Sequence, residues 1–117
     1  ELEERTHRIA EAARRALTEA GLKLHLESGF SDTVTVFDIP AETTCDAILS
    51  RMKKEHNIML AGSFDDLSGK VIRIGHMGNN ANFEDMTATM YALSETLTFL
   101  GVNLTGNLVG LFLKYYH

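Results

Sequence analysis

An arginine inside an otherwise apolar segment is the residue whose chemistry stands out most. Arg73 lies between Ile72 and Ile74 in the segment Val-Ile-Arg-Ile, and β-branched neighbours of this kind indicate a buried strand. A guanidinium in such a place must be paired, because an unpaired buried charge costs a large amount of free energy. We therefore expect an anionic group opposite Arg73.

Two interpretations of Arg73 are open from its neighbours alone. A partly exposed strand would let Arg73 pair with a surface acid, which is the commoner arrangement for a lone arginine. The alternative is a binding site, because the planar fork of arginine holds a carboxylate or phosphate through two hydrogen bonds. Gly75 and Gly78 favour a binding site, since they allow the backbone to bend or to approach a ligand closely. His76 lies between them, and we expect it to be structural rather than catalytic.

Other combinations of residues that carry chemistry have little support. Gly69-Lys70 lacks the spacing of a phosphate loop, because Gly62 lies too far upstream and Val71 stands where Ser or Thr would bind magnesium. The five histidines are dispersed, and the single cysteine, Cys45, falls on an apolar helix face. Neither a zinc site nor a Cys-His nucleophile is predicted, and no metal is expected.

The composition fits one folded domain that spans residues 1–117. Hydrophobic residues make up 44% of the chain and charged residues 23%, unlike a disordered protein. The net charge of −5, with scattered basic residues, argues against nucleic acid as a partner. No apolar run is long enough to cross a membrane, and a single cysteine suits a reducing compartment, so we expect a cytoplasmic protein. The first residues include neither an initiator methionine nor a signal peptide, as in a chain cut from a longer one.

Periodicity predicts the elements that must position Arg73. Apolar residues at helical spacing predict three helices, over 2–20, 45–56 and 83–100. Alternating or β-branched residues predict four strands, over 22–26, 33–37, 58–60 and 71–74. The order α-β-β-α-β-β-α indicates an α+β two-layer sandwich, a small sheet with helices packed on one face. We expect residues 102–117 to form a C-terminal tail or an additional element.

The segment around Arg73 resembles that of a known family. Residues 69–78 read Gly-Lys-Val-Ile-Arg-Ile-Gly-His-Met-Gly. This is similar to the segment Gly-Lys-x-x-Arg-Ile-Gly-x-x-Gly of the class V, fold type I, pyridoxal-phosphate (PLP)-dependent aminotransferases of the alanine-glyoxylate and serine-pyruvate group. The order of elements up to about Val102 is also similar, including residues 31–35 and the Ala61-Gly62 turn. By this resemblance the chain is identified as the C-terminal small domain of such an enzyme.

The resemblance implies a role for Arg73 and places the cofactor elsewhere. In this family the arginine of the segment binds the substrate α-carboxylate, which makes Arg73 the implied substrate-binding residue, with Gly75, His76 and Gly62 near the site. The Schiff-base lysine and the other PLP-binding residues of the family lie in its large domain. The chain is therefore expected to hold no PLP covalently and to be inactive alone, with Lys70 as a surface residue.

The implied parent enzyme is a homodimer. It would transfer an amino group from alanine, serine or a purine-breakdown amine to glyoxylate or pyruvate. One departure from the family is the turn 63–66, Ser-Phe-Asp-Asp, where many relatives are glycine-rich. This turn would narrow or recharge the substrate entrance, or would simply be a solvated acidic turn.

An alternative function is an autonomous ligand-binding or interaction module without catalysis. In such a module the turn after Arg73 would bind a small anion, or the last helix and the tail would bind a partner. A fragment separated from its large domain is instead expected to expose apolar residues of the first helix or of 108–113 and to self-associate.

Overall fold

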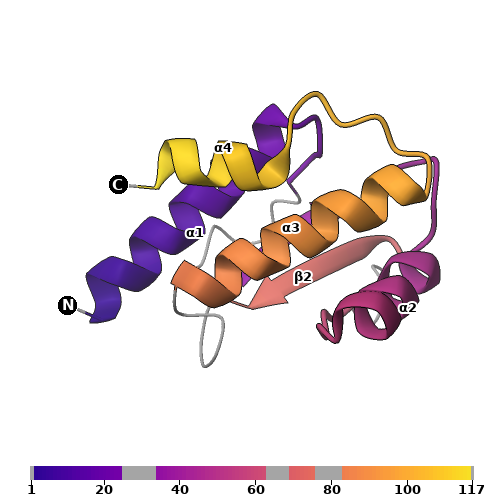
Figure 1. Ribbon diagram of the computed structural model, residues 1–117, viewed down its shortest axis with the longest axis horizontal. Coiled ribbons are helices and arrows are strands. Elements are labelled where there is room, and N and C mark those ends of the chain that lie inside the picture. Colours follow the sequence, from indigo (N-terminus) through magenta and orange to yellow (C-terminus); the bar gives the residue numbers. More distant parts are fainter. Residues whose placement is uncertain (1, 25–33, 63–68, 76–82, 117) are drawn as a thin grey trace.

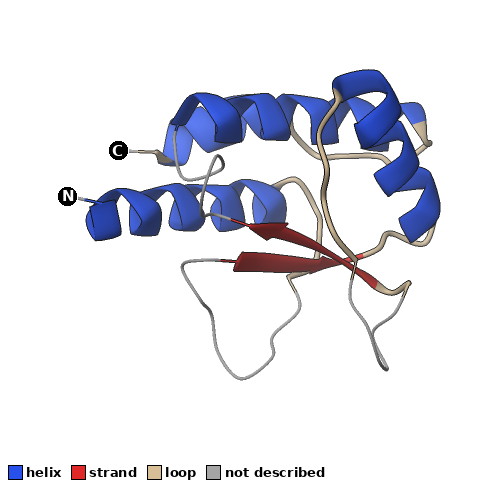
Figure 2. Ribbon diagram, turned by 90° about the horizontal axis from the view of Figure 1, so that it is seen from below, coloured by secondary structure: helices blue, strands red, loops and turns tan. Residues whose placement is uncertain are grey.

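The computed structural model describes residues 2–24, 34–62, 69–75 and 83–116. In Figures 1 and 2 the helices of this part of the chain lie on one side of a small sheet. This arrangement confirms the α+β class with helices on one face. The elements follow the order α1 (Leu2–Glu19), β1 (Val34–Asp38), α2 (Cys45–His56), β2 (Val71–Gly75), α3 (Phe83–Phe99) and α4 (Leu108–Tyr115).

The sheet is built on an antiparallel pair. β1 and β2 pair with Val36 opposite Arg73 and with Phe37 opposite Ile72. Residues that face each other across an antiparallel pair have their side chains on the same face. Phe37 and Ile72 are fully buried, so their face is the one that packs under the helices.

Two further chain segments join the sheet through single bridges. Leu24 pairs with Phe37 on the free edge of β1, and Ala61 pairs with Arg73 on the free edge of β2. The spatial order is therefore the segment at Leu24, β1, β2 and the segment at Ala61. The strand predicted over 22–26 is present as the bridge at Leu24, and its second half falls outside the described residues.

The prediction of a strand over 58–60 is wrong about the position of the strand. Asn57 ends α2 in the left-handed region, with φ 56°, and the amide of Ile58 still donates to the carbonyl of Met52 at 3.1 Å. The chain is thus engaged in closing the helix at this point. It reaches the edge of β2 only at Ala61.

The helices begin and end where their local signals predict. Thr44 accepts a hydrogen bond from the amide of Ala47 at 3.1 Å and so caps α2. Gly21 and Gly101 follow α1 and α3 with φ of 104° and 93°, which only glycine adopts without strain. No described helix is long and apolar enough to cross a membrane.

Residues 102–117 form more than a tail, because they contain α4. Asn107 caps this helix by accepting from the amides of Val109 and Gly110 at 2.8 and 3.2 Å. Leu108 and Phe112 are fully buried, and α4 lies alongside α1 (Figure 1). An additional helix therefore completes the core of the domain.

We expected the apolar residues of the first helix or of 108–113 to be exposed. For four of these residues the expectation is wrong. Ile9 and Leu17 of α1 are fully buried, as are Leu108 and Phe112 of α4. Val109 and Leu111 are half-buried, and Leu113 is 47% exposed. The described parts of α1 and α4 thus bury most of their apolar residues against each other.

Candidate functional site

Arg73 lies on the face of the sheet opposite the helices. Its neighbours Ile72 and Ile74 are fully buried, whereas Arg73 is exposed. Side chains alternate between the two faces of a strand, so Arg73 points away from the helical layer seen in Figure 2. The expectation of a buried guanidinium is therefore wrong, because the apolar neighbours belong to the other face.

No acid within the described part of the chain pairs with Arg73. Salt bridges there include Arg15–Glu11, Arg51–Glu95, His56–Glu95 and Lys114–Glu19, and none of these involves Arg73. The cross-strand neighbours of Arg73 are Val36 and Ala61, whose side chains have no acceptor. The described residues thus give no support to a surface salt bridge at Arg73.

The backbone of Arg73 is held from both sides. β1 pairs with it at Val36. On the other side the Arg73 amide donates to the Ala61 carbonyl at 2.8 Å, and the Ala61 amide donates to the Arg73 carbonyl at 3.4 Å. A strand fixed in this way carries its side chain in a defined direction, which suits a binding residue.

The other residues predicted near the site are placed as follows. Gly75 ends β2 opposite Val34, two residues after Arg73 and therefore on the same face. Gly62 follows Ala61, and a Cβ at this position would lie 3.3 Å from Cys45 Sγ, so close packing already accounts for this glycine. His76 and the turn 63–66 lie outside the described residues.

The lysines of this chain do not fit a PLP site. A lysine that forms a Schiff base is normally desolvated, which lowers its pKa and activates the amine. All five lysines are exposed. Lys70 lies in the turn before β2, where its carbonyl accepts from the Ile39 amide at 2.9 Å. We find no covalent anchor for the cofactor within these residues.

Cys45 is a packed residue. Burial, and then the charge of Asp46, raises the pKa of its thiol, which keeps the thiol protonated. Its Sγ lies 3.9 Å from the Val71 carbonyl. In the part of the chain that the structure describes, no three His, Cys, Asp or Glu side chains gather as metal ligands.

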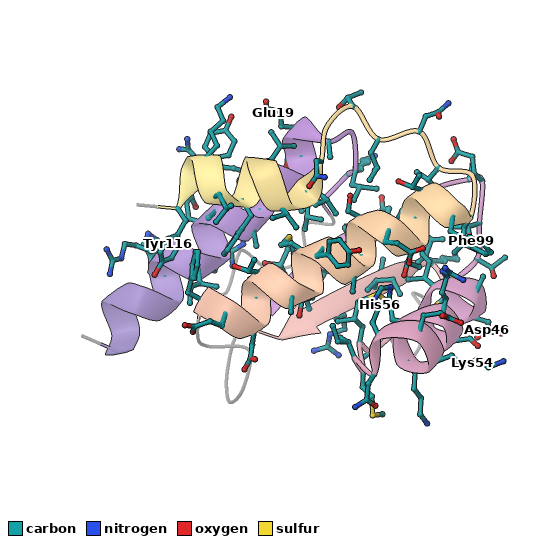
Figure 3. All side chains as sticks on the ribbon, viewed as in Figure 1. Glu19, Asp46, Lys54, His56, Phe99 and Tyr116 are labelled. Carbon is teal, nitrogen blue, oxygen red and sulfur yellow. The ribbon has the colours of Figure 1, made fainter. Side chains whose placement is uncertain are left out.

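Sequence reasoning did not anticipate a charged cluster between α2 and α3. Arg51 Nη2 donates to Glu95 Oε2 at 2.7 Å, and His56 Nε2 lies 2.8 Å from Glu95 Oε1. The hydrogen bonds from Arg51, and then from His56, lower the pKa of Glu95. Figure 3 shows His56 between the two helices and Phe99 near the end of α3, with the Arg51 guanidinium 3.5 Å above the Phe99 ring. This cluster joins the two helices.

A cavity of about 390 Å³ lies between α1 and α4. Two of its charged side chains, Arg15 and Glu11, pair with each other within α1 at 3.0 Å. Glu19, also in its wall, pairs with Lys114 of α4 at 3.5 Å and accepts a hydrogen bond from Tyr115. The contacts of Glu19 hold α4 against α1, and β2 takes no part in them.

Comparisons with curated proteins place the chain among enzymes several times its length. No protein-family model matches the chain. It is 33% identical over 98 residues to the small subunit of a soluble hydrogenase from Synechococcus sp. (strain PCC 6716), a match over 84% of this chain and 25% of that protein. It is 35% identical over 74 residues to the serine-glyoxylate aminotransferase of Arabidopsis thaliana, covering 62% of this chain and 18% of that enzyme. The chain thus spans about a quarter or less of these relatives.

The fold is also found in a solved enzyme. The crystal structure of ureidoglycine-glyoxylate aminotransferase from Bacillus subtilis superposes with a TM-score of 0.89 and 25% sequence identity. The match covers 97% of this chain and 30% of that one, so it includes α4 as well as the sheet. The described helices and sheet therefore correspond to one compact part of a larger enzyme.

Proposed function

The chain is homologous to the class V aminotransferases and has the fold of their C-terminal domain, and from this premise we propose that it supplies the substrate-carboxylate anchor of such an enzyme. Arg73 is the anchor. The observation that carries the proposal is an exposed arginine, without an ion pair among the described residues, on the face of the sheet opposite the helices.

The geometry of Arg73 suits a carboxylate. The planar guanidinium can donate two parallel hydrogen bonds to the two oxygens of a carboxylate, and this fixes orientation as well as position. Arg73 is held at the backbone by partners on both sides, so the substrate would be held in one direction. Gly75, two residues on, adds no side chain to the same face.

The cofactor would be held by the rest of the enzyme. PLP, where it is bound, supplies the electron sink for amino transfer. The residues of this chain would bind the carboxylate and orient the amino or keto acid, and none of them is proposed to move a proton. The domain thus contributes to substrate binding, and the chemistry depends on residues outside it.

The proposed reaction moves an amino group from a small donor to a keto acid. The donor would be alanine, serine or a purine-breakdown amine, and the acceptor glyoxylate or pyruvate. Both aminotransferases described above carry glyoxylate in their names, which supports a small keto acid as acceptor. The whole enzyme would be a cytoplasmic homodimer. An autonomous binding module is the weaker alternative, because no contact among the described residues favours it.

Replacement of Arg73 by lysine in the full-length enzyme tests the proposal. We expect kcat/KM for the amino donor to fall by an amount equivalent to about 1.5–3 kcal/mol, because lysine keeps the charge and loses the two-pronged hydrogen bond. The absorption spectrum of the bound cofactor should not change, since Arg73 is not proposed to touch it.

Arg15→Lys is the matched control, because Arg15 is an exposed arginine on α1. It should leave kcat/KM unchanged. Equal kinetics for Arg73→Lys and the unmodified enzyme would overturn the role of Arg73. Loss of the cofactor spectrum in Arg73→Lys would also contradict it, because that result would indicate a role in cofactor binding or folding.

A further inference from the structure

Ala61 is the nearest neighbour of Arg73 on the outer edge of the sheet. The two residues form a bridge, and Val36 faces Arg73 from the other side. Cβ atoms of residues opposed in this way lie about 4.5–5.5 Å apart on the same face. Val36, Arg73 and Ala61 therefore form a row across this face. On the outer side, the aliphatic part of the Arg73 side chain has the single methyl group of Ala61 as its neighbour.

Val36 and Ala61, on the two sides of Arg73, differ in whether a larger side chain would fit at their position. Val36 is 8% exposed and belongs to the packed middle of the sheet. Ala61 is exposed at the edge. A longer side chain at Ala61 would extend over the same open face as Arg73, whereas the position of Val36 is already filled. The space beside the Arg73 side chain on this outer side is therefore limited by Ala61.

The backbone of Ala61 is fixed despite its edge position. It exchanges two hydrogen bonds with Arg73, at 2.8 and 3.4 Å. Gly62 packs so closely that an added Cβ would approach Cys45 Sγ to 3.3 Å. Leu60, on the other side, is half-buried and packs against the core. A wall held on both sides cannot move aside to admit a larger ligand.

We propose that Ala61 is a specificity-determining residue, whose small side chain sets the size of the amino acid that can bind with its carboxylate on Arg73. The inference rests on the proposed function and adds a size limit to the same site. The ligands concerned are α-amino acids with short unbranched side chains. A larger residue at position 61 would exclude the longer members of this class first, because they occupy more of the space beside Arg73.

The test measures kcat/KM of the full-length enzyme for alanine, 2-aminobutyrate and norvaline, with glyoxylate as acceptor. Ala61→Leu should lower the norvaline-to-alanine ratio by about tenfold or more, because a mismatch of one methylene against an apolar wall already changes kcat/KM by about tenfold. Ala61→Gly should raise the same ratio. Ala88→Leu, an equal change at an exposed position on α3, is the matched control and should leave the ratio unchanged.

The outcomes separate this inference from the proposed function. If Arg73→Lys weakens all three donors and Ala61→Leu weakens them by one common factor, the role of Ala61 in specificity is overturned and that of Arg73 stands. If Arg73→Lys has no effect, the proposed function itself is wrong. If Ala61→Leu does not fold, Ala61→Gly decides, and an unchanged ratio in that variant would overturn the inference.

Discussion

At the scale of single residues, two arginines of this domain differ in the partner that the fold supplies. Arg51 donates to Glu95 at 2.7 Å, and its guanidinium stacks on the Phe99 ring at 3.5 Å. The donors and the planar face of this guanidinium are therefore used within the domain. Arg73 has no such acid among the described residues and is exposed. The same chemical group therefore joins two helices in one place and has no ion pair among the described residues in the other.

Glu95 should make the stability of the domain depend on pH. Hydrogen bonds from Arg51 and His56 lower its pKa in the native state, so the unfolded chain binds more protons in acid. The stability from this carboxylate is present above the unfolded pKa and is lost as the pH falls through the lower native pKa. Urea unfolding of the 117-residue chain below about pH 5 should show this loss.

Glu95→Gln tests this dependence. It should lower the free energy of unfolding near neutral pH by up to about 1 kcal/mol, because the pair is partly exposed. It should also make the acid limb of the stability profile shallower. Glu84→Gln, at an exposed position on the same helix, should change neither. An acid limb of unchanged slope in Glu95→Gln would show that other carboxylates cause it.

At the scale of elements, α4 closes the hydrophobic core that the sheet and the other helices form. Phe112 is fully buried and stacks on Phe83 of α3 with ring centroids 5.8 Å apart. Thr105 donates its amide to the Ala20 carbonyl at 2.9 Å, which fixes the entry to α4 beside the end of α1. This helix thus packs on α1 and α3 together, and the domain would be incomplete without it.

Phe112→Ala should destabilise the domain by about 3–5 kcal/mol, the usual cost of removing a fully buried phenylalanine. Chemical denaturation of the 117-residue chain measures the effect. Leu113→Ala is the neighbouring control and should cost much less, because Leu113 is 47% exposed. Equal losses in the two variants would contradict the packing of α4 described above.

At the scale of the whole molecule, the domain is one-sided. Its helices cover one face of the sheet (Figure 2). The exposed residues Arg73 and Ala61, which pair with each other, lie on the other face. The chain spans about a quarter of the curated relatives that it matches. Under the proposed function, Arg73 would supply one wall of a site, and the other walls would come from the rest of the enzyme.

The 117-residue chain alone, supplied with PLP, alanine and glyoxylate, should show no amino transfer. All five of its lysines are exposed, so none is desolvated as a Schiff-base lysine requires. Formation of pyruvate measures the reaction, and the full-length enzyme under the same conditions is the positive control. Measurable turnover by the 117-residue chain would contradict the division of the site between two domains.

The sequence by itself determined the first three helices, the two strands of the sheet and the resemblance to class V aminotransferases. The ends of the helices depend on local chemistry, such as the cap at Thr44 and the left-handed glycines Gly21 and Gly101, and these signals act within a few residues. The segment 69–78 was sufficient to identify Arg73 as the candidate residue for binding substrate. Periodicity also predicted the α+β class.

Only the tertiary structure decided which face Arg73 occupies and what lies beside it. A run such as Val-Ile-Arg-Ile does not say which of its side chains point to the core, because both strand faces carry apolar residues here. The pairing of Arg73 with Ala61, and that of Glu95 with Arg51 and His56, join residues distant in sequence. Such contacts depend on strand register and helix packing, which local signals do not specify.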